Sequence, residues 1–215
     1  MLPTGLGKTA IALLLCLHRL NTHPGSKVIF LAPTKPLCEQ HMATFKRHLD
    51  APDESFALFT GNVSPDKRAE LWENAQFVFS TPQGMENDVI GSRLDIDNVS
   101  LIVFDEAHRA TGEYSYVFLA KQYMARAKFP HILALTASPG SEMDKVMDVC
   151  VNLGIEQVEV RAPTDPDVAP YVQEVDIRPI RVTLSPEMLD IRKLLNDVMK
   201  TKVDVLRKAG LTRAS

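Results

Sequence analysis

Short apolar runs recur along the first 160 residues, and longer amphipathic or charged stretches separate them. Apolar runs of this length bounded by Pro, Gly or Asn predict strands buried on both faces, and the longer stretches predict helices. The predicted strands are residues 27–32, 56–60, 76–80, 101–104, 132–135 and 155–160. The predicted helices cover residues 9–20, 36–49, 65–72, 81–90, 114–127 and 142–153. This alternation predicts an α/β fold, with a mainly parallel sheet covered by helices on both faces.

The pattern changes after residue 161. Residues 162–170 are rich in proline and predict a linker, and residues 172–184 alternate like a strand pair that Pro179 confines to an edge or a bend. Ser185 and Pro186 have the N-cap and first-turn pattern of a helix that reaches about residue 208. Its apolar stripe contains Met188, Ile191, Leu194, Leu195, Val198, Met199 and Val205. Because a lone helix with such a stripe needs a partner, we expect the chain to be truncated at this end.

Composition narrows the class of protein without identifying a site. The 215 residues are 45% hydrophobic and 24% charged, which is typical of a globular protein. A formal charge of −3 gives no overall attraction to polyanions, so any nucleic-acid contact must be local. Cys16, Cys38 and Cys150 lack CxxC spacing and are expected to be small core residues in a reducing compartment. With no signal peptide and no apolar run of about 18 residues, we expect a cytoplasmic, nucleoid-associated protein without a membrane partner.

The start of the chain resembles the second half of a phosphate-binding loop. Residues 2–9 read Leu-Pro-Thr-Gly-Leu-Gly-Lys-Thr and run directly into an apolar helix. Glycines let successive N–H groups turn toward an anion, and the helix adds the positive end of its dipole. Lys8 would reach the β- and γ-phosphates of ATP, and the Thr9 hydroxyl would bind Mg²⁺. The residues expected to bind ATP are Thr4, Gly5, Leu6, Gly7, Lys8 and Thr9.

Two features of this loop depart from the strict pattern. Leu2 stands where a glycine is usual, and no strand precedes the loop, so we expect the chain to be truncated at its front as well. The alternative is a chance helix start that happens to read Gly-Leu-Gly-Lys-Thr.

A carboxylate pair supplies a second nucleotide element. Asp105 and Glu106 follow the predicted strand at 101–104, and ligands of parallel sheets gather beyond the carboxyl ends of the strands. Asp105 is suited to hold Mg²⁺ through water, and Glu106 to orient or deprotonate an attacking water. Alone, an apolar run ending in Asp-Glu is common, but together with Gly7-Lys8-Thr9 it favours a catalytic nucleotide site built on Lys8, Asp105 and Glu106.

Six segments occur in the order of the motifs of superfamily 2 helicases. They are residues 3–9, 32–37, 60–68, 80–83, 105–108 and 135–140, and they resemble motifs I, Ia, Ic, Ib, II and III. The segments Thr-Gly-Asn-Val-Ser-Pro-Asp-Lys-Arg and Thr-Ala-Ser-Pro-Gly most resemble the corresponding motifs of the archaeal Hef helicase/nucleases and the Fanconi anaemia M-type DNA translocases. RIG-I-like and Dicer helicases are the next most similar group.

This resemblance implies a RecA-like P-loop domain at residues 1–161 that binds ATP and Mg²⁺. Residues 162–184 would be a linker and extended segment, and residues 185–215 would begin a helical insertion domain. The resemblance assigns contacts with the backbone of one nucleic-acid strand to Pro33, Thr34, Lys35, Thr60, Gly61, Thr81 and Pro82. Without the family, simple helix capping explains Thr34 and Thr81 equally well. The resemblance assigns coupling between nucleotide state and strand grip to His108, Thr136 and Ser138, although His108 taken alone is more typical of a surface histidine.

The resemblance therefore implies the ATP-binding half of a helicase or translocase that acts on branched or forked DNA. Motifs IV to VI are absent, including an arginine whose loss costs about 10³–10⁵ in rate. We therefore expect little activity from this chain without a second RecA-like domain of the same protein. Two alternatives stay open: an RNA helicase or double-stranded-RNA-binding ATPase, and a non-catalytic nucleotide-binding module.

Overall fold

The computed structural model describes residues 1–3, 5–137, 143–172 and 178–210. The chain divides into two compact units, Met1–Val172 and Gln173–Ser215. The first unit contains the sheet and its covering helices, and the second contains one long helix.

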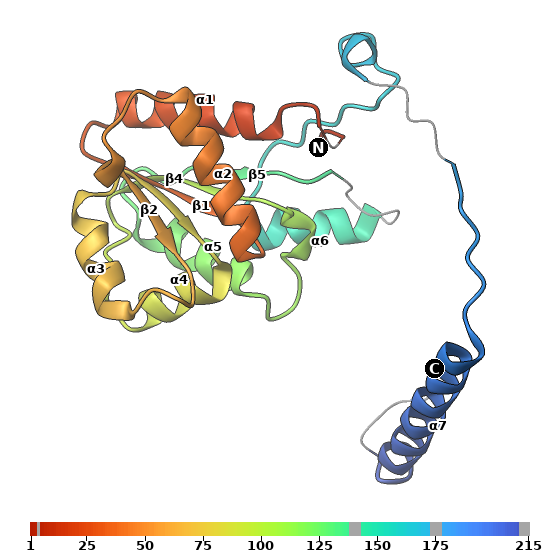
Figure 1. The fold of residues 1–215 in the computed structure, drawn as a ribbon. Coiled ribbons are helices and arrows are strands. Elements are labelled where there is room, and N and C mark those ends of the chain that lie inside the picture. The colour runs from red at the N-terminus through yellow and green to blue at the C-terminus, as the bar shows by residue number, and fades with distance from the viewer. Residues whose placement is uncertain (4, 138–142, 173–177, 211–215) are drawn as a thin grey trace. The chain divides into compact units, whose positions relative to one another are not determined.

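A five-stranded parallel sheet forms the centre of the first unit (Figure 1). Its order is β2-β3-β1-β4-β5, so the connections from β1 to β2 and from β3 to β4 pass over a neighbouring strand, as in doubly wound folds. The strands are β1 Lys27–Leu31, β2 Phe56–Phe59, β3 Phe77–Ser80, β4 Val99–Phe104 and β5 Ile132–Ala134. Because all five run the same way, the segments that follow them emerge at one edge of the sheet.

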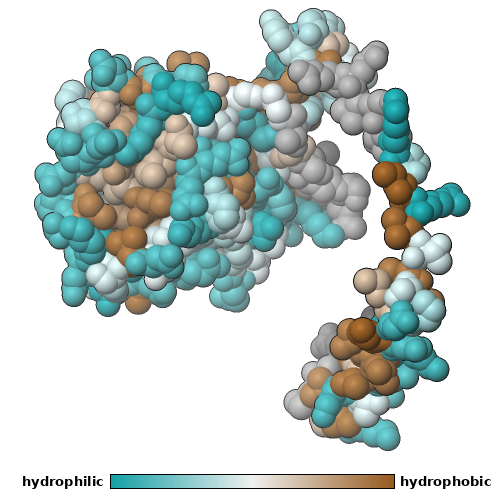
Figure 2. Space-filling model, in the orientation of Figure 1, coloured by the Kyte–Doolittle hydropathy of each residue, from teal (hydrophilic) through white to brown (hydrophobic). Residues whose placement is uncertain are grey.

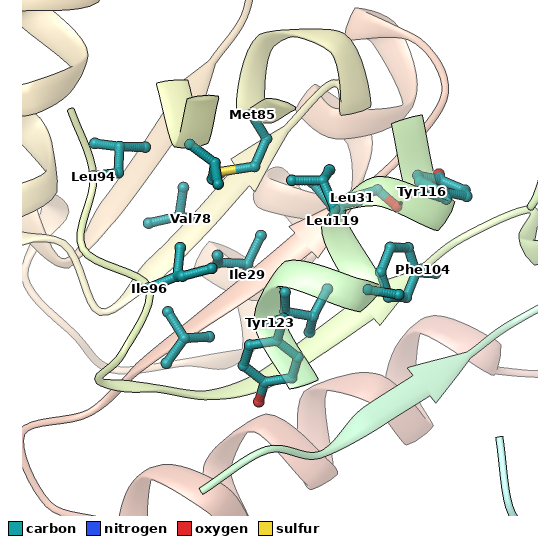
Figure 3. Packing of buried hydrophobic residues seen from close by; sticks show 14 of the residues in the cluster. Ile29, Leu31, Val78, Met85, Leu94, Ile96, Phe104, Tyr116, Leu119 and Tyr123 are labelled. Carbon is teal, nitrogen blue, oxygen red and sulfur yellow. Dashed lines mark hydrogen bonds between the residues drawn. The ribbon is translucent and has the colours of Figure 1, made fainter. Parts of the chain in front are cut away.

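Each strand divides its side chains between the two faces of the sheet. Val28 and Phe30 of β1 pack in one core with helices α1 and α2, whereas Ile29 and Leu31 pack in a second core on the other face. Figure 3 shows part of this second core, where Phe104 and Tyr116 lie edge to face with ring centroids 4.9 Å apart. The α-helices described in the first unit are α1 Lys8–Thr22, α2 Lys35–His48, α3 Pro65–Asn74, α4 Pro82–Ile90, α5 Ser115–Arg126 and α6 Met143–Leu153.

The strand predicted at residues 155–160 does not form. This segment has apolar alternation, but its backbone is bonded to the start of the chain rather than to the sheet: Arg161 N–H donates to the Met1 carbonyl, and the Met1 amino group donates to the Glu159 carbonyl. Residues 178–184 of the predicted strand pair are also exposed and irregular, and residues 173–177 lie outside the described part. Both corrections have one physical reason, because a strand requires a neighbouring strand to accept its hydrogen bonds.

Helix α7, Pro186–Lys208, begins where the sequence predicts. The Ser185 hydroxyl accepts a hydrogen bond from the Met188 N–H at 3.4 Å, and Pro186 occupies the first turn. Its apolar stripe is open to solvent, with Leu194 65% and Leu195 66% exposed. Figure 2 shows hydrophobic surface along α7. Within the described residues, no helix combines the length and hydrophobicity of a membrane span.

Candidate nucleotide and nucleic-acid sites

The predicted phosphate loop leads directly into α1. Gly5 and Gly7 have φ values of +83° and +82°, in the left-handed region that glycine adopts at little cost. Gly7 is the N-cap of α1, and its carbonyl accepts the Ile11 N–H at 3.1 Å. A Cβ atom at either glycine would meet nothing within 4 Å, so the backbone conformation and not crowding accounts for the glycines.

Lys8 folds back over its own loop. Its Nζ donates to the carbonyls of Leu2 at 2.8 Å and Pro3 at 3.1 Å. The Leu2 N–H donates to the Thr136 carbonyl at 3.3 Å, which ties the loop to the segment after β5. Thr4 lies outside the described residues. The Lys8 ammonium therefore lies over the carbonyls of its own loop.

A hydrogen-bonded chain joins Thr9 to Asp105 through a residue that the sequence did not indicate. His41 Nδ1 lies 3.3 Å from Thr9 Oγ1, and His41 Nε2 lies 3.0 Å from Asp105 Oδ2. The imidazole is buried and packs against the Phe30 ring, with centroids 4.3 Å apart. One signal was present in the sequence: His41 is a polar residue on the buried face of α2, between Cys38 and Phe45.

The backbone of Asp105 is fixed on both sides. Its N–H donates to the Leu31 carbonyl at 2.9 Å, and its carbonyl accepts the Tyr116 hydroxyl at 2.7 Å. The hydroxyl of Thr9 and the carboxylate of Asp105 thus lie on either side of one imidazole at the carboxyl edge of the sheet. Oxygen donors of this kind are the ligands that Mg²⁺ prefers, so the donor set fits the predicted metal.

Glu106 adopts an uncommon backbone conformation directly after Asp105. Its φ of +51° lies in the left-handed region, which is rare for residues other than glycine and clusters at functional sites. His108 Nδ1 lies 3.3 Å from Glu106 Oε2 and 3.2 Å from Thr136 Oγ1. The structure therefore brings together Glu106, His108 and Thr136, whereas Ser138 lies outside the described residues.

The residues predicted to contact nucleic acid also lie beyond the carboxyl ends of the strands, after β1, β2 and β3. Thr34 follows β1, Thr60 follows β2 and Thr81 follows β3, and these three strands are neighbours in the sheet. Thr34 and Thr81 are the N-cap residues of α2 and α4, but neither hydroxyl makes a capping hydrogen bond. Thr60 and Pro82 are buried, Gly61 and Lys35 are exposed, and Pro33 is partly buried. Lys35 Nζ lies 3.5 Å from Glu39.

A buried ion pair connects two of these segments. The Arg68 guanidinium of α3 makes two hydrogen bonds to the Asp88 carboxylate of α4, with Nη2 2.7 Å from Oδ1, and Nη1 also donates to the Val63 carbonyl. The hydrogen bonds to Asp88 raise the pKa of Arg68 above its ordinary value. The pair therefore ties the loop after β2 to the helix that begins at Thr81 and Pro82. No pattern in the sequence indicated this ion pair.

A model of the DEAD/DEAH box helicase family matches residues 1–146. The chain belongs to the DEAD/DEAH box helicase family. The helicase domain of Hef from Pyrococcus furiosus superposes with a TM-score of 0.79 at 46% identity, covering 98% of this chain and 44% of that one. The predicted RecA-like α/β fold and the resemblance to Hef are thus confirmed.

Proteins named as DNA helicases and a protein named as an RNA helicase are similar to this DEAD/DEAH box domain. A protein of Methanocaldococcus jannaschii, 45% identical over 98% of this chain and 27% of its own length, carries the name of an ATP-dependent RNA helicase. The ATP-dependent DNA helicase mph1 of Neurospora crassa is 40% identical over 98% of this chain and 18% of its own length. The DNA helicase Fancm of Drosophila melanogaster is 36% identical over 100% of this chain and 15% of its own length. The chain thus spans between 15% and 27% of these relatives.

Proposed function

We propose that this domain is the ATP-binding motor half of an ATP-dependent DNA helicase or translocase that acts on branched or forked DNA in repair and replication restart. The observation that carries the proposal is the shared edge of the sheet. Thr9 and Asp105 meet there through His41, and the segments after β1, β2 and β3 emerge beside them. One edge would thus hold a nucleotide and a strand together, as a motor requires.

Each residue at this edge has a role in the proposal. The N–H groups of residues 5–9 and the Lys8 ammonium would bind the phosphates, with Lys8 leaving the carbonyls of Leu2 and Pro3. Thr9 and Asp105 would hold Mg²⁺, which when bound withdraws charge from the β- and γ-phosphates. Glu106 would orient the attacking water and accept its proton. His108 and Thr136 would couple nucleotide state to strand grip, and Ser138 would share this role.

The segments after β1, β2 and β3 would contact the nucleic-acid strand. Pro33, Thr34, Lys35, Thr60, Gly61, Thr81 and Pro82 would contact the sugar-phosphate backbone through N–H groups, hydroxyls and helix starts. Such contacts position a strand without reading its sequence. The names of the mph1 and Fancm relatives support DNA as the substrate, and the name of the Methanocaldococcus relative supports RNA as the second candidate. Full activity would require a second RecA-like domain, and the protein would work at the nucleoid in the cytoplasm.

Two substitutions separate nucleotide binding from hydrolysis. We expect Lys8→Ala to abolish binding of a fluorescent ATP analogue to this domain without changing its circular dichroism. We expect Glu106→Gln to retain binding but to slow strand-stimulated hydrolysis by about 10²–10⁴ in a protein that also carries the second motor domain. Lys121→Ala, at an exposed position on α5, is the matched control and should behave as wild type.

The outcomes discriminate between the candidate functions. Wild-type affinity in Lys8→Ala would refute the loop assignment, and unchanged turnover in Glu106→Gln would remove Glu106 from its role. Offering forked DNA and duplex RNA to the two-domain protein decides the substrate, since the proposal requires greater stimulation of hydrolysis by the fork. Nucleotide binding without turnover on either substrate would identify a non-catalytic binding module.

A further inference from the structure

His41 is buried at the proposed nucleotide site, yet none of the assigned functions uses it. Its side chain is 9% exposed, and its two ring nitrogens face Thr9 and Asp105. Phe30 packs against the ring, so the imidazole has little freedom to turn away. Thr9 lies 32 residues before it and Asp105 lies 64 residues after it, so the fold alone brings the three together.

The hydrogen-bonding capacities of the three groups fix the direction of the chain. An ionised carboxylate only accepts hydrogen bonds, so His41 Nε2 carries the proton directed at Asp105 Oδ2. In the neutral ring Nδ1 is then an acceptor, and the Thr9 hydroxyl donates its proton to it. With its proton held by His41, the Thr9 oxygen has lone pairs left for a cation. Asp105 likewise keeps Oδ1, which accepts no hydrogen bond from the described residues.

We propose that His41 is a positioning residue that orients the Thr9 hydroxyl and the Asp105 carboxylate for Mg²⁺ in the ATP complex. The inference rests on the proposed function. Groups that hydrogen-bond to metal ligands fix the direction of the ligand lone pairs, and their loss typically costs 10–100-fold in metal affinity. His41 hydrogen-bonds both to Thr9, the proposed ligand, and to Asp105, which would hold the ion through water, so a single substitution releases both.

The test separates Mg²⁺ binding from nucleotide binding. His41→Leu fills the buried position with an apolar side chain and removes both hydrogen bonds. His41→Gln retains one hydrogen-bond donor and one acceptor. Affinity for a fluorescent ATP analogue is measured on this domain in EDTA and across a Mg²⁺ titration. We expect His41→Leu to raise the Mg²⁺ concentration of half-saturation by about 10–100-fold and to leave the affinity in EDTA unchanged. His41→Gln should recover part of the loss, and His48→Gln, an exposed histidine on the same helix, should match wild type.

Each outcome is decisive. A wild-type Mg²⁺ dependence in folded His41→Leu would overturn the inference and leave His41 a packing residue. If His41→Leu fails to fold, His41→Gln and His41→Asn carry the test, because the shorter Asn cannot reach both partners. Recovery by Gln and not by Asn supports the inference, and equal Mg²⁺ affinity of both variants with wild type overturns it. Absence of any Mg²⁺-dependent nucleotide binding by the wild-type domain would instead refute the proposed function.

Discussion

Two buried polar clusters in this domain differ in how their carboxylates are satisfied. In the cluster of Arg68 and Asp88, both oxygens of Asp88 accept hydrogen bonds from one guanidinium, and the Asp88 side chain is fully buried. In the cluster of Thr9, His41 and Asp105, one oxygen of Asp105 accepts from His41, and the Asp105 side chain keeps 10% exposure. We call the first cluster closed, and we call the second open because Asp105 Oδ1 accepts no hydrogen bond from the described residues.

This difference distinguishes a structural carboxylate from a candidate metal ligand. A carboxylate held by a bidentate arginine has little capacity left for a cation, so Asp88 joins α4 to α3 rather than binding a ligand. The Asp105 backbone is held by hydrogen bonds at its N–H and its carbonyl, and its Oδ1 accepts no hydrogen bond from the described residues. Burial alone does not separate the two residues, because both are buried.

Breaking the closed cluster should have the largest effect on stability. Arg68→Met removes both hydrogen bonds to the buried Asp88 carboxylate and leaves it the exposed Arg93, whose Nη1 lies 3.7 Å from Oδ1. We expect the free energy of unfolding to fall by about 3–5 kcal/mol. The double variant Arg68→Met with Asp88→Leu removes both charges and should recover most of the loss. Urea unfolding followed by circular dichroism measures both values.

The control for this prediction is an exposed arginine. Arg126 lies 3.1 Å from Asp97, with a side chain 37% exposed. Arg126→Met should cost less than about 1 kcal/mol, because solvent screens such pairs. Equal losses in Arg68→Met and Arg126→Met would show that the closed cluster is no more structural than a surface pair.

The open cluster depends on the glycine loop before it, which gives the second prediction. Gly7→Ala places a Cβ atom on a residue with φ of +82°, and we expect a loss of about 1–2 kcal/mol in the free energy of unfolding. Gly61→Ala is the matched control, because a Cβ there also meets nothing within 4 Å but the backbone is outside the left-handed region. Equal stability of the two variants in urea would contradict the conformational explanation.

Local patterns predicted the five strands of the sheet. Residues 28–31 and 101–104 are apolar because both faces of these strands are covered, and Asp105 follows directly, so its place at the carboxyl end of the sheet was predictable. His41 was missed because its two partners come from distant segments, and no pattern within α2 reports them. The pairing of Arg68 with Asp88 was missed for the same reason. The strand predicted at 155–160 is wrong because alternation reports local preference, whereas a strand also requires a neighbour.

The smallest expected effect concerns the hydrogen bond from the Tyr116 hydroxyl to the Asp105 backbone in the open cluster. The buried Tyr116 hydroxyl donates to the carbonyl of Asp105 at 2.7 Å and lies 3.3 Å from the carbonyl of Leu31. Tyr116→Phe removes these hydrogen bonds, and we expect it to lower the free energy of unfolding by about 1 kcal/mol at neutral pH. Tyr171→Phe, at a 75% exposed position, should have no measurable effect.

The pH dependence distinguishes this hydroxyl from a mere packing contribution. Burial raises the pKa of Tyr116 above its ordinary value. Above pH of about 10 the unfolded chain therefore releases this proton before the folded protein does, and stability falls as pH rises. The Phe variant lacks this proton, so its deficit relative to wild type should shrink by up to about 1.4 kcal/mol per pH unit between pH 10 and 11. Parallel stability profiles in this range would mean that the Tyr116 hydroxyl does not anchor the Asp105 backbone in a buried, protonated form.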